Sequence, residues 1–228
     1  MKNRLSCLIS VSLLGAIGSQ WAIADSHAAQ AHHSEHAEHG QMMQTERQNP
    51  FEAVNAQMMQ DMHALAATGD VDYDFMRGMV AHHQGAIGMA KVMLKHGGDE
   101  SILTLAREIV AAQETEISQM QAWLQEHGQP EPGEQAQNII AALQRIDQRM
   151  MADMQLPSSG DVTKDFVLGM IPHHIAAVDM AYVLLAHSAH ADLRDMAQAV
   201  IREQEREIRQ LNTWLQKASA PVDAHAHH

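Results

Sequence analysis

Apolar residues recur at helical spacing over most of the chain beyond residue 50, and no run of β-branched or aromatic residues alternates with polar ones. The first pattern indicates helices with one buried face, whereas the second would have indicated strands. A long helix is expected to begin with Asp72 or Asp74 as its cap and to end at His96, where two glycines follow. Asp99 can cap the next helix, which continues to about His127. The pattern predicts an all-α protein.

The helical pattern occurs twice along the chain. Residues 74–124 align with residues 165–215 at a constant offset of 91 without a gap, and 20 of the 51 aligned positions are identical. A shorter match lies upstream of each copy at an offset of 92, and it predicts a short helix at about 51–67 and another at about 134–155. Two helical hairpins with similar apolar faces pack most simply as a four-helix bundle, with the short helices as covers.

The segments around the repeats differ from them in composition. The chain opens with positive charge and an apolar run too short for a stable membrane anchor. Ala22-Ile23-Ala24 follows, a pattern typical of a signal peptide that is cleaved after Ala24, so the protein is expected in the periplasm. No later stretch is expected to span a membrane. The expected organisation is a signal peptide at 1–24, a disordered His-rich tail at 25–50, a first repeat at 51–127, a linker and the start of a covering helix at 128–140, a second repeat at 141–217 and a His-containing tail at 218–228.

Charge restricts the class of partner. The chain has 15 basic and 28 acidic side chains, so its formal net charge is −13 at pH 7. Such a surface repels the phosphate backbone of nucleic acids and attracts cations. Methionine and histidine are abundant, with 17 residues each, whereas aromatic residues make up only 4% of the chain. The expected partners are therefore metal ions, and nucleic acid is not expected to bind.

Histidine and methionine coincide on the buried face of the first long helix in each copy. Steps of four and three residues lead through methionine, histidine and methionine, and a second histidine lies beside the first. On the partner helices, Glu116 and Glu207 fall on inward positions, where a carboxylate is costly without a donor or a metal. The antiparallel hairpin is expected to bring Glu116 near the first histidine pair. The candidate metal ligands are Met79, His82, His83, Met89, Met93, His96 and Glu116 in the first copy, and Met170, His173, His174, Met180, His187 and Glu207 in the second.

Each of these residues also has an ordinary structural explanation. A methionine stripe usually fills a core, a buried histidine is usually hydrogen-bonded, and the two glutamates could neutralise histidines as buried ion pairs. The repeated combination favours metal binding, and thioethers together with imidazoles favour Cu(I) over zinc or iron. Two alternatives remain open. One is a ferritin-like metal oxidase acting on Cu(I) or Fe(II), although only two inward glutamates are found; the other is a metal-free helical scaffold that responds to pH.

The mature N-terminus predicts a different class of metal site. Cleavage after Ala24 would expose Asp25-Ser26-His27, in which a free amine, two amide nitrogens and the imidazole of the third residue can form a square-planar site. That geometry suits Cu(II) or Ni(II), and Cu(II) is the ion expected there. The other histidines of the tail would add weak ligands nearby.

The motif Gly-Met-x-x-His-His…Met-Ala, followed by Gln-x-x-Glu-Ile and Trp-Leu, resembles the DUF305 family of exported bacterial proteins over about residues 52–125 and 143–217. The resemblance implies a ferritin-like helical bundle and a periplasmic role in copper binding and copper resistance. We therefore expect a protein that sequesters or relays copper without catalytic turnover, in exchange with other periplasmic copper carriers or exporters.

The two copies match the family's characteristic positions at Met79, His82, His83, Met89 and Glu116 and at their five counterparts. They depart from each other elsewhere, so the two copies are not expected to form identical sites. The departures are Leu184 opposite Met93, Leu211 opposite Met120, and Ala81 where a proline is common in the family and where the second copy has Pro172.

Overall fold

The structure is a computed structural model that describes residues 49–220. The predicted signal peptide, nearly all of the N-terminal tail with the candidate ligands Asp25, Ser26 and His27, and most of the C-terminal tail lie outside the described residues. Within the described range there are helices and no strands, which confirms the all-α prediction. The helices are α2 (Glu52–His63), α3 (Val71–His96), α4 (Glu100–His127), α5 (Ala136–Met154), α6 (Val162–His187) and α7 (Ala191–Ala218).

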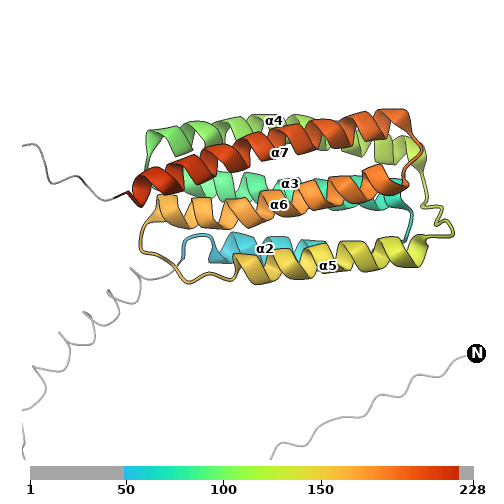
Figure 1. Ribbon diagram of the computed structural model, residues 1–228, viewed down its shortest axis with the longest axis horizontal. Helices are drawn as coiled ribbons and strands as arrows, with labels where there is room; N and C mark the ends of the chain where they lie inside the picture. The colour runs from blue at the N-terminus through green and yellow to red at the C-terminus, as the bar shows by residue number, and fades with distance from the viewer. Residues whose placement is uncertain (1–48, 221–228) are drawn as a thin grey trace, which may run out of the picture. The chain divides into compact units, whose positions relative to one another are not determined.

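These helices lie in three layers, each with one helix from either copy (Figure 1). α3 and α6 form the middle layer and run antiparallel, α4 and α7 cover one face, and α2 and α5 cover the other. α3 packs most extensively against α4, and α6 against α7, which are the two hairpins predicted from the duplication. The four long helices thus form a bundle that the short helices cover.

Aspartates fix the N-termini of the long helices. Asp99 caps α4 as predicted, because its side chain accepts backbone N–H groups of the first helical turn. α3 begins earlier than predicted, since Asp70 is its cap, and Asp72 and Asp74 lie inside the helix. Asp161, which matches Asp70 at the repeat offset, caps α6 in the same way. The prediction of the cap was therefore wrong for α3 by one turn or less.

Asp74 binds the loop that precedes α3. Its carboxylate accepts the backbone N–H groups of Thr68 and Gly69 and the Thr68 hydroxyl, at 2.7–2.9 Å. Thr68 and Gly69 can reach the Asp74 carboxylate only if the preceding helix ends early. The periodicity predicted an end at about residue 67, whereas α2 ends at His63. Three aspartates at alternate positions all have capping chemistry, so the periodicity alone does not distinguish the cap from the loop ligand.

α6 corrects one expectation from the sequence. Its length and its mean hydropathy of 1.4 over its most apolar 18 residues are those of a membrane-spanning helix, although no such stretch was expected beyond the signal peptide. In the structure, 56% of that stretch is buried inside the protein, against α3, α5 and α7. A helix in the middle layer is covered on most of its circumference, which accounts for an apolar composition on nearly all sides.

The core consists of two apolar clusters with buried polar residues between them. One cluster contains Phe75 and Met180, and the other contains Met89 and Phe166. On all four long helices, the change from one cluster to the other occurs close to buried polar side chains. We call this group the histidine layer; it consists of His82, His83, Gln113, His173, His174, Gln204 and Glu207.

Candidate metal centre

Two adjacent histidines of α3 meet two of α6 in the middle of the bundle. All four imidazoles are fully buried. The rings of His82 and His173, which are counterparts in the two copies, lie 3.6 Å apart between centroids. Because counterparts face each other, the pseudo-twofold axis that relates the hairpins passes between these two rings.

Hydrogen bonds determine which ring nitrogens of the first pair carry protons. His82 Nε2 lies 2.9 Å from the carbonyl oxygen of His173, and a carbonyl oxygen can only accept, so Nε2–H is the donor. His83 Nε2 donates to the Glu116 carboxylate at 2.6 Å, as the hairpin predicted. In the neutral form of both rings, Nδ1 is therefore the nitrogen that keeps a lone pair.

The second copy repeats the histidine–glutamate pair with two differences. His174 Nε2 lies 2.8 Å from Glu207 Oε2, but the ring is not aligned for a hydrogen bond, and both atoms are left without a partner. Glu207 is also less exposed to solvent: its side chain is 2% exposed, compared with 25% for that of Glu116. Arg206 lies 3.5 Å from the other oxygen of Glu207. The two carboxylates thus differ in solvation and in partners.

The histidine layer contains an unusual number of buried atoms without hydrogen-bond partners. They include Nδ1 of all four histidines, both polar side-chain atoms of Gln113 and Oε1 of Gln204. An unpaired buried polar group costs about 1–3 kcal/mol, and native proteins hold only a few of them per hundred residues. A histidine whose other nitrogen is bound to a carboxylate or a backbone carbonyl is the arrangement that orients an imidazole toward a metal ion. His82 and His83 have this arrangement, whereas in the second copy Nε2 of both histidines is unpaired as well. The unpaired ring nitrogens are candidate metal-ligand atoms.

Burial keeps the imidazoles of His82 and His173 neutral. It lowers the pKa of His82 and of His173 well below the usual value of 6.5, and the neighbouring histidines lower both further through repulsion between positive charges. A hydrogen bond to backbone raises the pKa of His82 by less than burial lowers it. Because a metal ion binds only the neutral ring, these two nitrogens are ready to coordinate at neutral pH.

The metal-free protein is expected to lose stability as the pH falls below about 6.5. Below that pH the unfolded chain takes up protons at His82 and His173, whereas the folded chain does not. The free energy of unfolding therefore falls by about 1.4 kcal/mol per pH unit for each of the two residues. Asp147 has the opposite effect and offsets the loss from one of the two histidines. Burial raises its pKa to about 6, so below pH 6 the folded chain binds a proton that the unfolded chain does not yet bind. Between pH 6 and 5 the net loss from these groups is about 1.4 kcal/mol.

Urea unfolding at pH 7, 6 and 5 in the presence of a chelator measures this loss. The variant Asp147→Asn should about double the pH dependence below pH 6, because it removes the opposing group. A double variant, His82→Gln and His173→Gln, should reverse the sign of the slope, since Asp147 then acts alone. A wild-type free energy of unfolding that stays constant from pH 6.5 to 5 would contradict the neutral, buried state of the two histidines.

The predicted methionine ligands are all buried, but at different levels of the bundle. Met79 and Met170 lie four residues before the second histidine of their own helix, and therefore on the same face. Met89 and Met180 lie about two helical turns beyond the histidines. The methyl group of Met180 packs over Gly78 of the opposite helix, where a Cβ would come within 3.0 Å of it, and Met89 packs in the same way over the counterpart glycine.

Three further predicted ligands lie away from the histidine layer. His96 is exposed at the end of α3, and its Nδ1 lies 2.9 Å from the backbone carbonyl of Val92. His187 ends α6 and is half-buried, while Met93 is buried in a flanking apolar cluster. About 20 Å of helix separates His96 from the histidine pair of α3. The prediction that His96 lies on the buried stripe was wrong, because the heptad pattern continues beyond the point where the neighbouring helices cover it.

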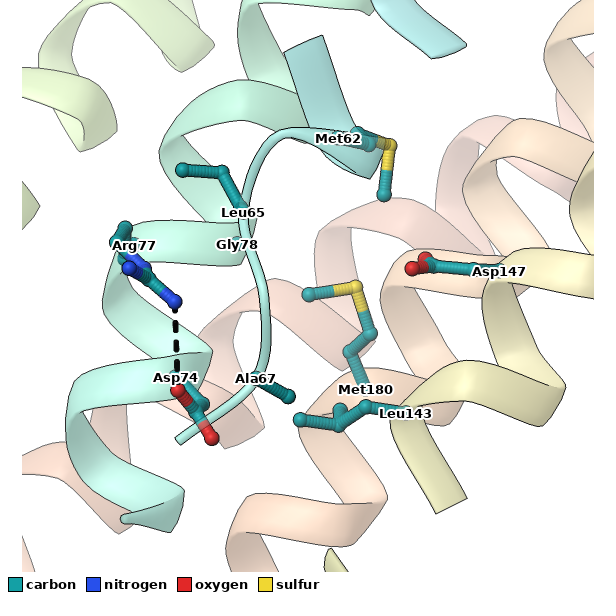
Figure 2. A pocket seen from close by; sticks show the side chains of 9 residues that line it. All are labelled: Met62, Leu65, Ala67, Asp74, Arg77, Gly78, Leu143, Asp147 and Met180. Carbon is teal, nitrogen blue, oxygen red and sulfur yellow. Dashed lines mark ion pairs between the residues drawn. The ribbon is translucent and has the colours of Figure 1, made fainter. Parts of the chain in front are cut away.

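Two groups with metal-binding chemistry were missed by the sequence analysis. Met62 of α2 and Asp147 of α5 line a small cavity together with Met180, as Figure 2 shows. The periodicity marks both short helices as covers and does not show which of their side chains turn inward. Within residues 49–220, no three His, Asp or Glu side chains come together as a ready-made metal site.

The chain resembles solved structures and a known family of proteins. The chain is similar to solved structures of CopM in the Cu(I)-bound form (28% identity, TM-score 0.51, 65% of this chain and 98% of that chain), the Ag-bound form (30%, 0.51, 65% and 97%) and the Cu(II)-bound form (31%, 0.50, 64% and 97%). No curated protein sequence matches the chain. The family model described as "Domain of unknown function (DUF305)" matches residues 12–124 and 72–215. Since these matches cover well over half of its length, the chain belongs to the DUF305 family.

Proposed function

We propose that this protein binds copper in its helical bundle, and that the histidine layer is the principal site. The observation that carries the proposal is the set of four buried Nδ1 atoms without hydrogen-bond partners. A copper ion is an electron-pair acceptor, and it would satisfy lone pairs that are otherwise costly to bury. Glu116 and Glu207 would hold the outer ring nitrogens of His83 and His174 in the orientation that binding requires.

Cu(I) is the oxidation state that we propose for this layer. Met79 and Met170 supply buried thioethers one helical turn from the histidines, and thioethers select Cu(I) among the common biological metals. The similarity to CopM structures with Cu(I), Cu(II) and Ag supports copper or a like ion as the ligand. We keep the mature N-terminus, Asp25 to His27, as a proposed Cu(II) site of a different kind, on residues outside the described range.

The biological role that we propose is sequestration or relay of copper in the periplasm. The signal-like N-terminal segment supports export, and the absence of cysteine after residue 7 leaves methionine and histidine as the ligands available in an oxidising compartment. A fully buried site favours storage or transfer over turnover, and exchange with other copper carriers would follow from that role.

Anomalous diffraction at the copper edge, from crystals loaded with Cu(I), tests the site directly. Anomalous density is expected within bonding distance of at least one unpaired Nδ1 of the histidine layer. Density confined to surface histidines, with none in the layer, would contradict the proposal. Oxygen uptake measured after addition of Cu(I) or Fe(II) distinguishes the alternative oxidase function, because a storage protein adds nothing to the uncatalysed rate.

A further inference from the structure

A small cavity lies where α2, α3, α5 and α6 meet, on the side of the middle layer away from α4 and α7. Figure 2 shows that the sulfur atoms of Met62 and Met180 and the carboxylate of Asp147 turn toward the same space. These side chains come from α2, α6 and α5, respectively. The cavity volume is about 40 Å³, which is room for an ion or a few waters and too little for an organic ligand.

Asp147 is a half-buried residue of α5 that lines the cavity. Among the described residues no donor is hydrogen-bonded to its carboxylate and no cation pairs with it within 4.0 Å. Burial raises its pKa to about 6, and the positive charge of His63 lowers it by less than that. The carboxylate is half-buried and thus partly desolvated, and a bound cation is one partner that would stabilise it.

The other charged groups of the cavity are already paired. Asp74 lies 3.7 Å from Arg77 and also accepts the N–H groups of the loop before α3. Arg77 donates to the backbone carbonyl of Ala66. The positive charge of Arg77 disfavours a divalent cation, and the single free carboxylate balances one positive charge. Two thioethers with one carboxylate therefore match a soft ion of charge +1.

The repeat supplies a comparison within the same chain. The counterparts of Met62 and Met180 are Met154 and Met89, so both thioethers are kept, whereas the counterpart of Asp147 is Asn55. An amide occupies the same helical position in the other copy. The packing of a covering helix at this position therefore does not require an acid, and the charge of Asp147 is a property of one half of the molecule.

We propose that Met62, Met180 and Asp147 form a second site for a soft monovalent cation, Cu(I) or Ag(I), separate from the histidine layer. The choice of ion rests on the proposed copper-binding function, and the site itself does not depend on the histidines. In this proposal Met180 is a ligand at the cavity. The heptad pattern had grouped it with the histidine pair, which lies about two helical turns away.

The test uses Ag(I), which shares the ligand preferences of Cu(I) without its redox chemistry, and the full chain labelled with ¹³C at the methionine methyl groups. Ag(I) is expected to shift the Met62 and Met180 methyl resonances together. Asp147→Asn should weaken the apparent affinity of that response about tenfold or more. Met62→Leu keeps the side-chain volume and should abolish the saturable response of Met180.

Met76→Leu is the matched control, because Met76 is a buried methionine of α3 that does not line the cavity. It should leave the response of both resonances unchanged. The inference is overturned if Met62 and Met180 do not respond to Ag(I), or if Asp147→Asn responds at the same Ag(I) concentration as the wild type.

Histidine side-chain ¹⁵N resonances, recorded in the same titration, separate this site from the proposed function. A response of the histidines without Met62 and Met180 refutes the second site and leaves the histidine layer standing. A response of the two methionines without the histidines supports the second site and refutes the histidine layer.

Discussion

Replacing His82, His83, His173 and His174 by alanine is expected to remove most of the Cu(I) binding of the bundle. The variant lacks every imidazole of the histidine layer, and with them the four unpaired Nδ1 atoms. Loss of a residue that only orients a metal ligand already weakens binding about 10–100-fold, so loss of the ligands themselves should weaken it about a hundredfold or more. Competition with a chromogenic Cu(I) chelator measures the change.

The matched control removes the same number of imidazoles from outside the layer, at His63, His96, His187 and His190. It should retain the tight site, and it tests the conclusion that His96 and His187 lie too far from the layer to contribute. A second variant of the layer, with glutamine at all four positions, keeps polar side chains of similar size in case the alanine variant fails to fold. Full copper stoichiometry in a folded glutamine variant would refute the site assignment.

Gly69→Ala is expected to destabilise the protein by about 3 kcal/mol, through two effects that add. Gly69 has a φ of +90°, which a residue with a side chain adopts only at a cost of about 1–2 kcal/mol. In addition, a Cβ at Gly69 would lie 2.4 Å from Cβ and 2.7 Å from Cα of Ala136 at the start of α5, and this backbone cannot simply rotate away. The loop before α3 therefore has room only for glycine.

Gly160, its counterpart before α6, separates the two effects. Its φ is +82°, but nothing lies within 4 Å of the position of an added Cβ. Gly160→Ala should cost only the conformational part, about 1–2 kcal/mol. Urea unfolding of both variants in chelator measures the difference. Equal destabilisation would show that the contact with α5 relaxes without cost.

Much of the fold follows from patterns that are local in the chain. The period of the apolar residues and the offset of 91 were enough to predict two hairpins, the cap at Asp99 and the end of α4 at His127. The inward position of Glu116 near His83 also follows, because a short connection forces an antiparallel hairpin and thereby fixes which turns face each other. These predictions needed only one helix and its neighbour in sequence.

The other features of the site depend on the register between α3 and α6, which no local sequence pattern determines. That register brings the His82 ring against the His173 ring, places Met180 over Gly78, and leaves His96 beyond the covered part of the bundle. Asp147 was missed for a related reason. A covering helix with one polar residue at an inward position reads as an ordinary amphipathic helix until its partners are known.

The contact between His82 and His173 has a consequence for assembly. One hairpin carries only half of the histidine layer, so a chain with a single copy could complete it only by associating with a second molecule. Its copper affinity would then fall on dilution. Here the segment from His127 to α6, which includes α5, tethers the two halves within one molecule. Copper binding by the proposed site is therefore expected to be independent of protein concentration.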